Sequence, residues 1–184
     1  MNLLAISGSL RSGSHNTRLL RAAGGLLPNG VELELYDGLA LVPPYNEDAD
    51  GEDAPAAVVH FREAIAAADA LLFATPEYNS SVPGHLKNAI DWASRPLATN
   101  VLRNKPSAVV GASTGAFGAV WAQAELRKVL AAAGARVVEG DVALGHAPTR
   151  FDETGALVDE EIREQLAEVL RELVAQVRPV TAGA

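Results

Sequence analysis

The chain alternates short apolar runs with segments of helical periodicity, and this alternation most constrains what it can fold into. Residues 70–74 (Ala-Leu-Leu-Phe-Ala) show it clearly, because the run is too short for a helix and is soon followed by Pro76. Such a run is typical of a buried parallel strand. The sequence predicts strands at residues 2–7, 31–36, 69–75, 106–112 and 136–144, and helices at 15–27, 56–68, 85–95, 121–133 and 159–177.

Strands that alternate with helices are joined by right-handed crossovers into a parallel sheet with helices on both faces. We therefore predict an α/β fold with a doubly wound, five-stranded parallel sheet in the order 2-1-3-4-5. The chain has no internal repeat or linker, so we expect residues 1–184 to form a single domain. In this order, the loops after strands one, three and four meet at the carboxyl edge of the sheet, where open α/β folds bind ligands.

Composition excludes several classes of function. The net charge is −8 at pH 7 and the pI is about 5.0, so we expect neither a nucleic-acid partner nor binding to an anionic membrane. The chain has no cysteine, so disulfides and thiolate chemistry are excluded and any redox activity needs a bound cofactor. No signal peptide or membrane-spanning run is recognisable, and we expect a cytoplasmic protein.

The loop after the third predicted strand contains an aromatic ring, amides and hydroxyls, in the sequence Pro76-Glu77-Tyr78-Asn79-Ser80-Ser81. It has no cluster of metal ligands, and the four histidines of the chain are too scattered to share a metal ion. These groups suit a flat organic cofactor with a polar rim better than they suit a metal.

The first predicted strand is followed by the loop Gly8-Ser9-Leu10-Arg11-Ser12-Gly13-Ser14-His15-Asn16-Thr17. A helix N-terminus attracts phosphate, and glycines, hydroxyls and an arginine suit that ligand. A Walker A loop would need Lys and then Ser or Thr after Gly13, and the dinucleotide fingerprint Gly-x-Gly-x-x-Gly is also absent. Two interpretations stay open. The loop holds one terminal phosphomonoester, as flavin mononucleotide (FMN) requires, or it is a turn in which Ser14 or Asn16 is an ordinary N-cap.

Three segments together resemble the motifs of one family. They are Gly8-Ser9-Leu10-Arg11-x-Gly-Ser14-x-Asn16, then Pro76-Glu77-Tyr78-Asn79-x-Ser-x-Pro83-Gly84-x-Leu-Lys87-Asn88-Ala-x-Asp91-Trp92, then Ser113-Thr114-Gly115. The chain resembles the NADPH-dependent FMN reductase family, which includes bacterial quinone, chromate and azo-dye reductases. The resemblance spans about residues 2–144. The middle motif is long and specific, and the other two occur in the matching order.

The resemblance implies a flavodoxin-like fold with non-covalently bound FMN, in a homodimer or homotetramer whose active site lies near the subunit interface. By position, Ser9, Arg11, Ser14 and Asn16 would hold the phosphate. Pro76, Glu77, Tyr78 and Asn79 would line the isoalloxazine and ribityl side, and Ser113, Thr114 and Gly115 would close the other side of the ring. Where the family often has paired glycines this chain has Gly118-Ala119, and the extra methyl is expected to narrow the approach of nicotinamide or substrate.

The expected function is an FMN-dependent NAD(P)H oxidoreductase, which moves hydride from NADPH or NADH through flavin N5 to a quinone or similar small acceptor. Because the flavin carries this chemistry, we predict no catalytic side chain. The alternatives are an electron carrier of flavodoxin type and a ligand-binding or regulatory protein with the same fold. The acceptor and the choice between NADH and NADPH stay open.

The helix after the Pro76 loop adds two expectations. Lys87 and Asp91 are four residues apart, and we expect an ion pair between them. Trp92 is expected either in the core or at a dimer interface, and the interface is favoured because amphipathic aromatic side chains are common there.

Overall fold

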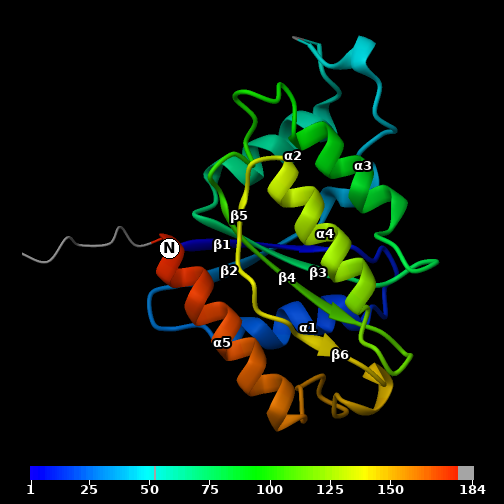
Figure 1. The fold of residues 1–184 in the computed structure, drawn as a ribbon, viewed down its shortest axis with the longest axis vertical. Helices are drawn as coiled ribbons and strands as arrows, with labels where there is room; N and C mark the ends of the chain where they lie inside the picture. Colours follow the sequence, from blue (N-terminus) through cyan, green and yellow to red (C-terminus); the bar gives the residue numbers. More distant parts are fainter. Residues whose placement is uncertain (52, 178–184) are drawn as a thin grey trace, which may run out of the picture.

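The computed structural model describes residues 1–51 and 53–177, and a parallel sheet lies at its centre (Figure 1). The strand order is β2-β1-β3-β4-β5, with β6 also paired to β4. The predicted α/β fold and strand order are therefore confirmed. The strands are β1 (Asn2–Ser7), β2 (Glu32–Tyr36), β3 (Ala70–Thr75), β4 (Pro106–Ala112), β5 (Arg136–Val137) and β6 (Ala143–Leu144).

Helices cover both faces of the sheet, as predicted (Figure 1). Side chains alternate along each strand, so Leu72 belongs to the core on one face while Leu71 and Phe73 belong to the core on the other. The first core is completed by α1 (His15–Gly24) and α5 (Glu160–Val177). The second is completed by α2 (Ala56–Ala67), α3 (Gly84–Ala93) and α4 (Val120–Ala132). Short 3-10 turns are η1 (Gly38–Leu41), η2 (Glu47–Ala49) and η3 (Ala147–Thr149).

Most predicted boundaries lie within two residues of the observed ones, and two elements differ by more. The predicted strand at 136–144 is two short strands, because Gly140 between them lies against α5 and its carbonyl accepts a hydrogen bond from Arg127 at 2.9 Å. The first helix ends at Gly24 instead of residue 27, since the pair Gly24-Gly25 favours helix termination. Leu26 and its neighbour still pack against the core as part of the turn that follows.

The end of the long motif, from Asn88 to Trp92, fixes the chain before α2. Asn88 accepts the Tyr45 N–H at 2.7 Å and donates to the Pro43 carbonyl at 2.8 Å. The Trp92 indole N–H donates to the same carbonyl at 2.8 Å, and its ring lies edge-on to Tyr45 with centroids 4.8 Å apart. Trp92 is only 1% exposed, so the favoured position at a subunit interface is wrong. An internal carbonyl already satisfies its polar atom.

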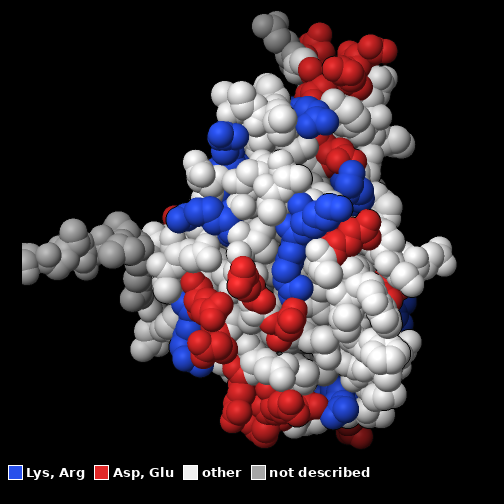
Figure 2. Space-filling view, in the orientation of Figure 1, with Lys and Arg blue, Asp and Glu red and all other residues white. Residues whose placement is uncertain are grey.

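Charged groups of both signs are interspersed over the face shown in Figure 2. Acidic side chains gather around η2 and where α5 begins, and basic side chains lie over α4 in the middle of this face. The predicted Lys87–Asp91 ion pair is present, with Nζ and Oδ1 2.7 Å apart. Among residues 1–51 and 53–177, no helix combines the length and the apolar character needed to cross a membrane.

Candidate functional site

Three loops meet at the carboxyl edge of the sheet: the β1 loop (residues 8–14), the β3 loop (76–83) and the β4 loop (113–119). The Gly8 N–H donates to the Ala74 carbonyl at 2.7 Å, which extends the pairing of β1 with β3. A Cβ on Gly8 would lie 2.7 Å from Leu86 Cδ2 and 3.3 Å from Pro76 Cδ. Glycine therefore lets the β1 loop lie directly against the β3 loop.

The β1 loop presents backbone N–H groups at the start of α1. Within the described part of the chain, the N–H groups of residues 10–13, 15 and 16 donate to no protein acceptor. The Ser14 hydroxyl is buried and accepts the Thr17 N–H at 3.2 Å, so Ser14 is the N-cap of α1. Its role as a cap and the proposed phosphate site are compatible, because capping occupies one donor and leaves the others facing the loop.

The side chains of Ser9 and Arg11 belong to the same loop. Ser9 donates its N–H to the Ser7 hydroxyl at 3.3 Å, which curves the backbone as it leaves β1. Arg11 is exposed, and a Cβ on Gly13 would be 3.7 Å from its Nη1, so the guanidinium lies over the loop. A positive side chain next to free N–H groups at a helix N-terminus favours an anion.

The Asn16 side chain bonds to β4. Its buried amide donates to the Ala112 carbonyl and accepts the Ala112 N–H, both at 2.9 Å. Both ends of the amide are thus engaged by the last residue of β4. The side chain therefore ties the start of α1 to the β4 loop, and the backbone N–H of Asn16 is the group that faces the β1 loop.

The β3 loop is a tight turn. Tyr78 and Ser81 exchange two backbone hydrogen bonds of 3.1 Å, and Asn79 and Ser80 between them have φ values of 52° and 61°. Left-handed conformations at both central positions are typical of a type I′ turn, for which asparagine is well suited. The Tyr78 side chain is 50% exposed, so its ring is available at the surface of this edge.

Glu77 does not turn its carboxylate toward the loops. One oxygen accepts the N–H groups of Trp121 and Ala122, at 3.1 and 3.2 Å, in the first turn of α4. The prediction that Glu77 lines the cofactor therefore does not extend to its carboxylate, which caps a helix. Only its backbone remains at the sheet edge.

The β4 loop pairs with the segment around β6. The Ser113 N–H donates to Leu144 O at 3.0 Å, and His146 N–H donates to Gly115 O at 2.9 Å. The Ser113 hydroxyl accepts the Gly115 N–H at 3.1 Å, while Thr114 is exposed. This places Ser113, Thr114 and Gly115 together opposite the β1 loop. No pattern near residues 113–115 predicted that a second segment supports them.

Ala119 lies at the left-handed φ of 64° that precedes α4, and its side chain is only 2% exposed. Since the methyl is buried, the expectation that it narrows the approach to the site is wrong. The neighbouring Gly118, with φ of 56°, has no room for a side chain because a Cβ would overlap the backbone of Ala143. The buried Gln123 also donates to the Gly118 carbonyl at 2.9 Å.

Two exposed aromatic residues of this edge were missed in the sequence analysis. Phe117 is 64% exposed and Trp121 is 50% exposed, and their rings make an edge contact with centroids 5.2 Å apart. Trp121 carried only the signal of a helix start. An exposed large aromatic pair is unusual for a surface without a partner or ligand. We call Phe117 and Trp121 the aromatic pair.

Histidines next to the β1 loop are disposed to be neutral. Burial lowers the pKa of His15, and the nearby charges of Arg11 and Arg18 lower it further. Burial also lowers the pKa of His85, although a hydrogen bond to the Gly8 backbone partly opposes the shift. Near pH 7 the positive charge of the loop therefore comes from arginine.

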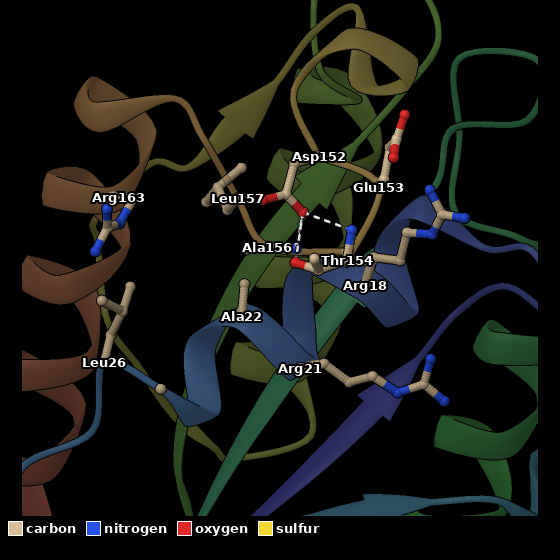
Figure 3. A pocket seen from close by; sticks show the side chains of 12 residues that line it. Arg18, Arg21, Ala22, Leu26, Asp152, Glu153, Thr154, Ala156, Leu157 and Arg163 are labelled. Atoms are coloured by element: carbon tan, nitrogen blue, oxygen red, sulfur yellow. Dashed lines mark hydrogen bonds between the residues drawn. The ribbon is translucent and has the colours of Figure 1, made fainter.

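A cavity of about 620 Å³ lies away from this edge, between α1 and the turn at residues 152–157 (Figure 3). Ala22, Leu26 and Leu157 give it an apolar lining, while Arg18 and Arg163 lie on opposite sides of it and do not converge. None of the predicted site residues lines this cavity, so we do not assign the cofactor to it. The part of the chain that the structure describes has no group of three His, Asp or Glu residues able to hold a metal ion.

The strand order and the three loops at one edge define a flavodoxin-like protein. The sequence profile of NADPH-dependent FMN reductases matches residues 1–149, and the chain belongs to this family.

Named relatives agree with this membership. An NAD(P)H-dependent FMN reductase of Pseudomonas aeruginosa is 48% identical over 179 residues, which cover 97% of this chain and 96% of the relative. A 2-hydroxy-1,4-benzoquinone reductase of a Burkholderia species is 38% identical over 179 residues, with 97% of each chain covered. The solved structure of FerB, a flavoenzyme NAD(P)H:(acceptor) oxidoreductase from Paracoccus denitrificans, superposes with a TM-score of 0.85 at 35% identity, covering 96% of each chain.

Proposed function

We propose that this protein is an FMN-dependent NAD(P)H oxidoreductase that passes hydride to a quinone or a similar small acceptor. The observation that carries the proposal is the β1 loop at the carboxyl edge of a flavodoxin-like sheet, where Arg11 lies beside N–H groups that have no acceptor among residues 1–51 and 53–177. Its relatives include an NAD(P)H-dependent FMN reductase and a 2-hydroxy-1,4-benzoquinone reductase.

The residues at this edge fit FMN. A terminal phosphate matches the N–H groups of residues 10–13, 15 and 16, with Arg11 and the Ser9 hydroxyl beside them. On the ring, Pro76, Tyr78 and Asn79 would contact one side, and Ser113, Thr114 and Gly115 the other. Ser14, Asn16 and Glu77 would act by shaping the loops, because their side chains cap α1, bridge to β4 and cap α4, respectively.

FMN, when bound, supplies the redox chemistry, since it accepts hydride from a nicotinamide and donates electrons to an acceptor. The protein's own task is to bind and orient. The turn at Tyr78–Ser81 presents a ring and polar groups in a conformation set before any ligand arrives. Because the lowered pKa values of His15 and His85 leave both rings neutral near pH 7, the positive charge of this loop comes from Arg11. The attraction for phosphate should therefore change little with pH in this range.

We also propose a single-domain, cytoplasmic protein that assembles as a homodimer or homotetramer. Support for assembly comes from the exposed aromatic pair at the start of α4 and from the exposed Tyr78 of the β3 loop. Sedimentation at several protein concentrations tests the oligomer, and fractionation of the source cells tests the location.

The function is tested with purified protein and added FMN, followed by anaerobic addition of NADPH or NADH. We expect bound flavin to lose its absorbance near about 450 nm and to regain it when a quinone is added. Flavin that binds but stays oxidised would make the protein an electron carrier instead. Protein that binds no flavin would overturn the proposal.

A further inference from the structure

Two carboxylates connect the β3 loop to α4, in opposite directions. Glu77 of the loop accepts the N–H groups of Trp121 and Ala122 in α4, at 3.1 and 3.2 Å. One turn later, Glu125 of α4 accepts the Ser81 hydroxyl at 2.6 Å and the Val82 N–H at 3.2 Å from the loop. We call these two residues the carboxylate clamp.

Glu77, the first half of the clamp, supplies a hydrogen-bond acceptor that the N-terminus of α4 lacks. The N-cap position of this helix is Ala119, which has no side-chain acceptor. Acceptors at the first turn normally come from Ser, Thr, Asp or Asn at the N-cap itself. Here the acceptor comes from Glu77, 44 residues earlier than Trp121, and its negative charge also lies at the positive end of the helix dipole.

The second half fixes the other end of the turn. The Ser81 hydroxyl and the Val82 N–H lower the pKa of Glu125, so the carboxylate is ionised throughout the neutral range. Between the two contacts lies the turn from Tyr78 to Ser81, closed by its own backbone hydrogen bonds. Both ends of this turn are therefore attached to one helix.

We propose that Glu77 and Glu125 are positioning residues, which fix Tyr78 relative to the aromatic pair at the start of α4. Glu77 is the neighbour of Tyr78 and accepts the backbone N–H of Trp121, which is a member of the aromatic pair. A single carboxylate therefore connects the segment that carries Tyr78 to the aromatic pair. The clamp preorganises this edge for a planar ring. The inference rests on the proposed function, because the planar ring is taken to be that of FMN or its acceptor.

The test compares Glu77→Ala, Glu77→Gln and Glu125→Ala with Glu172→Ala, an exposed acidic control on α5. Amide hydrogen exchange of residues 76–83 is measured in the protein without FMN, and FMN affinity is measured separately by fluorescence quenching. We expect the two alanine variants to exchange faster in this segment and to bind FMN about fivefold more weakly. Glu77→Gln keeps the acceptor oxygen and is expected to stay within about twofold of the unmodified protein.

Unchanged exchange in both alanine variants would overturn the proposal. So would equal loss in Glu77→Gln and Glu77→Ala, because the charge itself would then serve the ligand. If Glu77→Ala does not fold, Glu125→Ala decides the matter, since it leaves the cap of α4 intact. Exchange is read without ligand. A protein that binds no FMN would therefore defeat the proposed function alone, while unchanged exchange would defeat the clamp alone.

Discussion

Residues 76–81 and residues 86–92 belong to one continuous motif, yet they are used in opposite ways. The first part is an exposed turn held by hydrogen bonds at its ends, with Tyr78 half in solvent. The second part is a helix face whose Asn88 and Trp92 are engaged by the backbone near Pro43. A motif that identifies a family therefore mixes groups available to ligands with groups that hold the scaffold, and the difference becomes visible only in the contacts.

The largest effect should come from the buried half. Trp92→Ala removes a side chain that is 1% exposed together with its hydrogen bond to Pro43, so the free energy of unfolding should fall by about 3–5 kcal/mol. Urea unfolding followed by circular dichroism measures this. The matched control is Trp121→Ala, which should lower the free energy of unfolding by only about 0.5–1.5 kcal/mol, because that residue is half exposed and loses one ring contact with Phe117. Equal losses in the two variants would remove the contrast between the halves.

The exposed half should show the reverse pattern. Tyr78→Ala is expected to leave the free energy of unfolding within about 0.5 kcal/mol and to weaken FMN binding about fivefold, as loss of an aromatic contact does. Fluorescence titration with FMN measures the affinity. Tyr78→Phe keeps the ring and should bind nearly as well as the unmodified protein. An affinity that Tyr78→Ala does not change would place the ring outside the site.

His85 stands at the junction of the two halves and gives a dependence on pH. Its pKa is lower in the folded protein than in the unfolded chain, so folding favours the neutral form. The stability that this shift provides is complete above the unfolded pKa of about 6.5 and is lost as the pH falls through the folded value. The urea midpoint should therefore be lower at about pH 5.5 than at about pH 7.5, and His85→Gln should reduce the difference. An unchanged difference in His85→Gln, with exposed His146→Gln as control, would contradict this.

The smallest effect is expected from the ion pair on the outer face of α3. Lys87 and Asp91 are both partly exposed, and i,i+4 pairs of this kind contribute about 0.3–0.5 kcal/mol. Lys87→Met, Asp91→Asn and the double variant form a cycle that isolates the interaction. A coupling energy above about 1 kcal/mol would indicate that the pair has a further partner.

The fold could be predicted because its signal is local. Apolar runs such as residues 70–74 and the stripe of α5 at Leu166, Leu170 and Leu173 show their period within a few residues, and strand order follows from connection rules. The break between β5 and β6 could not be predicted, since it depends on Gly140 meeting α5. The pair Gly24-Gly25 indicated a helix end at this point. The prediction extended the helix to residue 27 because Leu26 and Leu27 continue its apolar spacing.

The site was predictable by loop but not by side-chain role. The β1, β3 and β4 loops were located from small and polar residues after predicted strands, and the structure brings them together. The actual partners of Asn16 and Glu77 lie 96 and 44 residues away, so no local pattern contains them. Trp121 was likewise placed at a helix start with no indication that half its surface stays in solvent.

The bridge from Asn16 to Ala112 has one more consequence. An amide that bonds both to the carbonyl and to the N–H of a single residue resists both sliding and tilting, because either movement would break one of the two bonds. The start of α1 and the end of β4 must therefore shift as a unit when the protein fluctuates. The distance between the β1 and β4 loops is therefore fixed by the sheet. Changes in solvent, temperature or bound partner should move the surrounding loop residues before they change that distance.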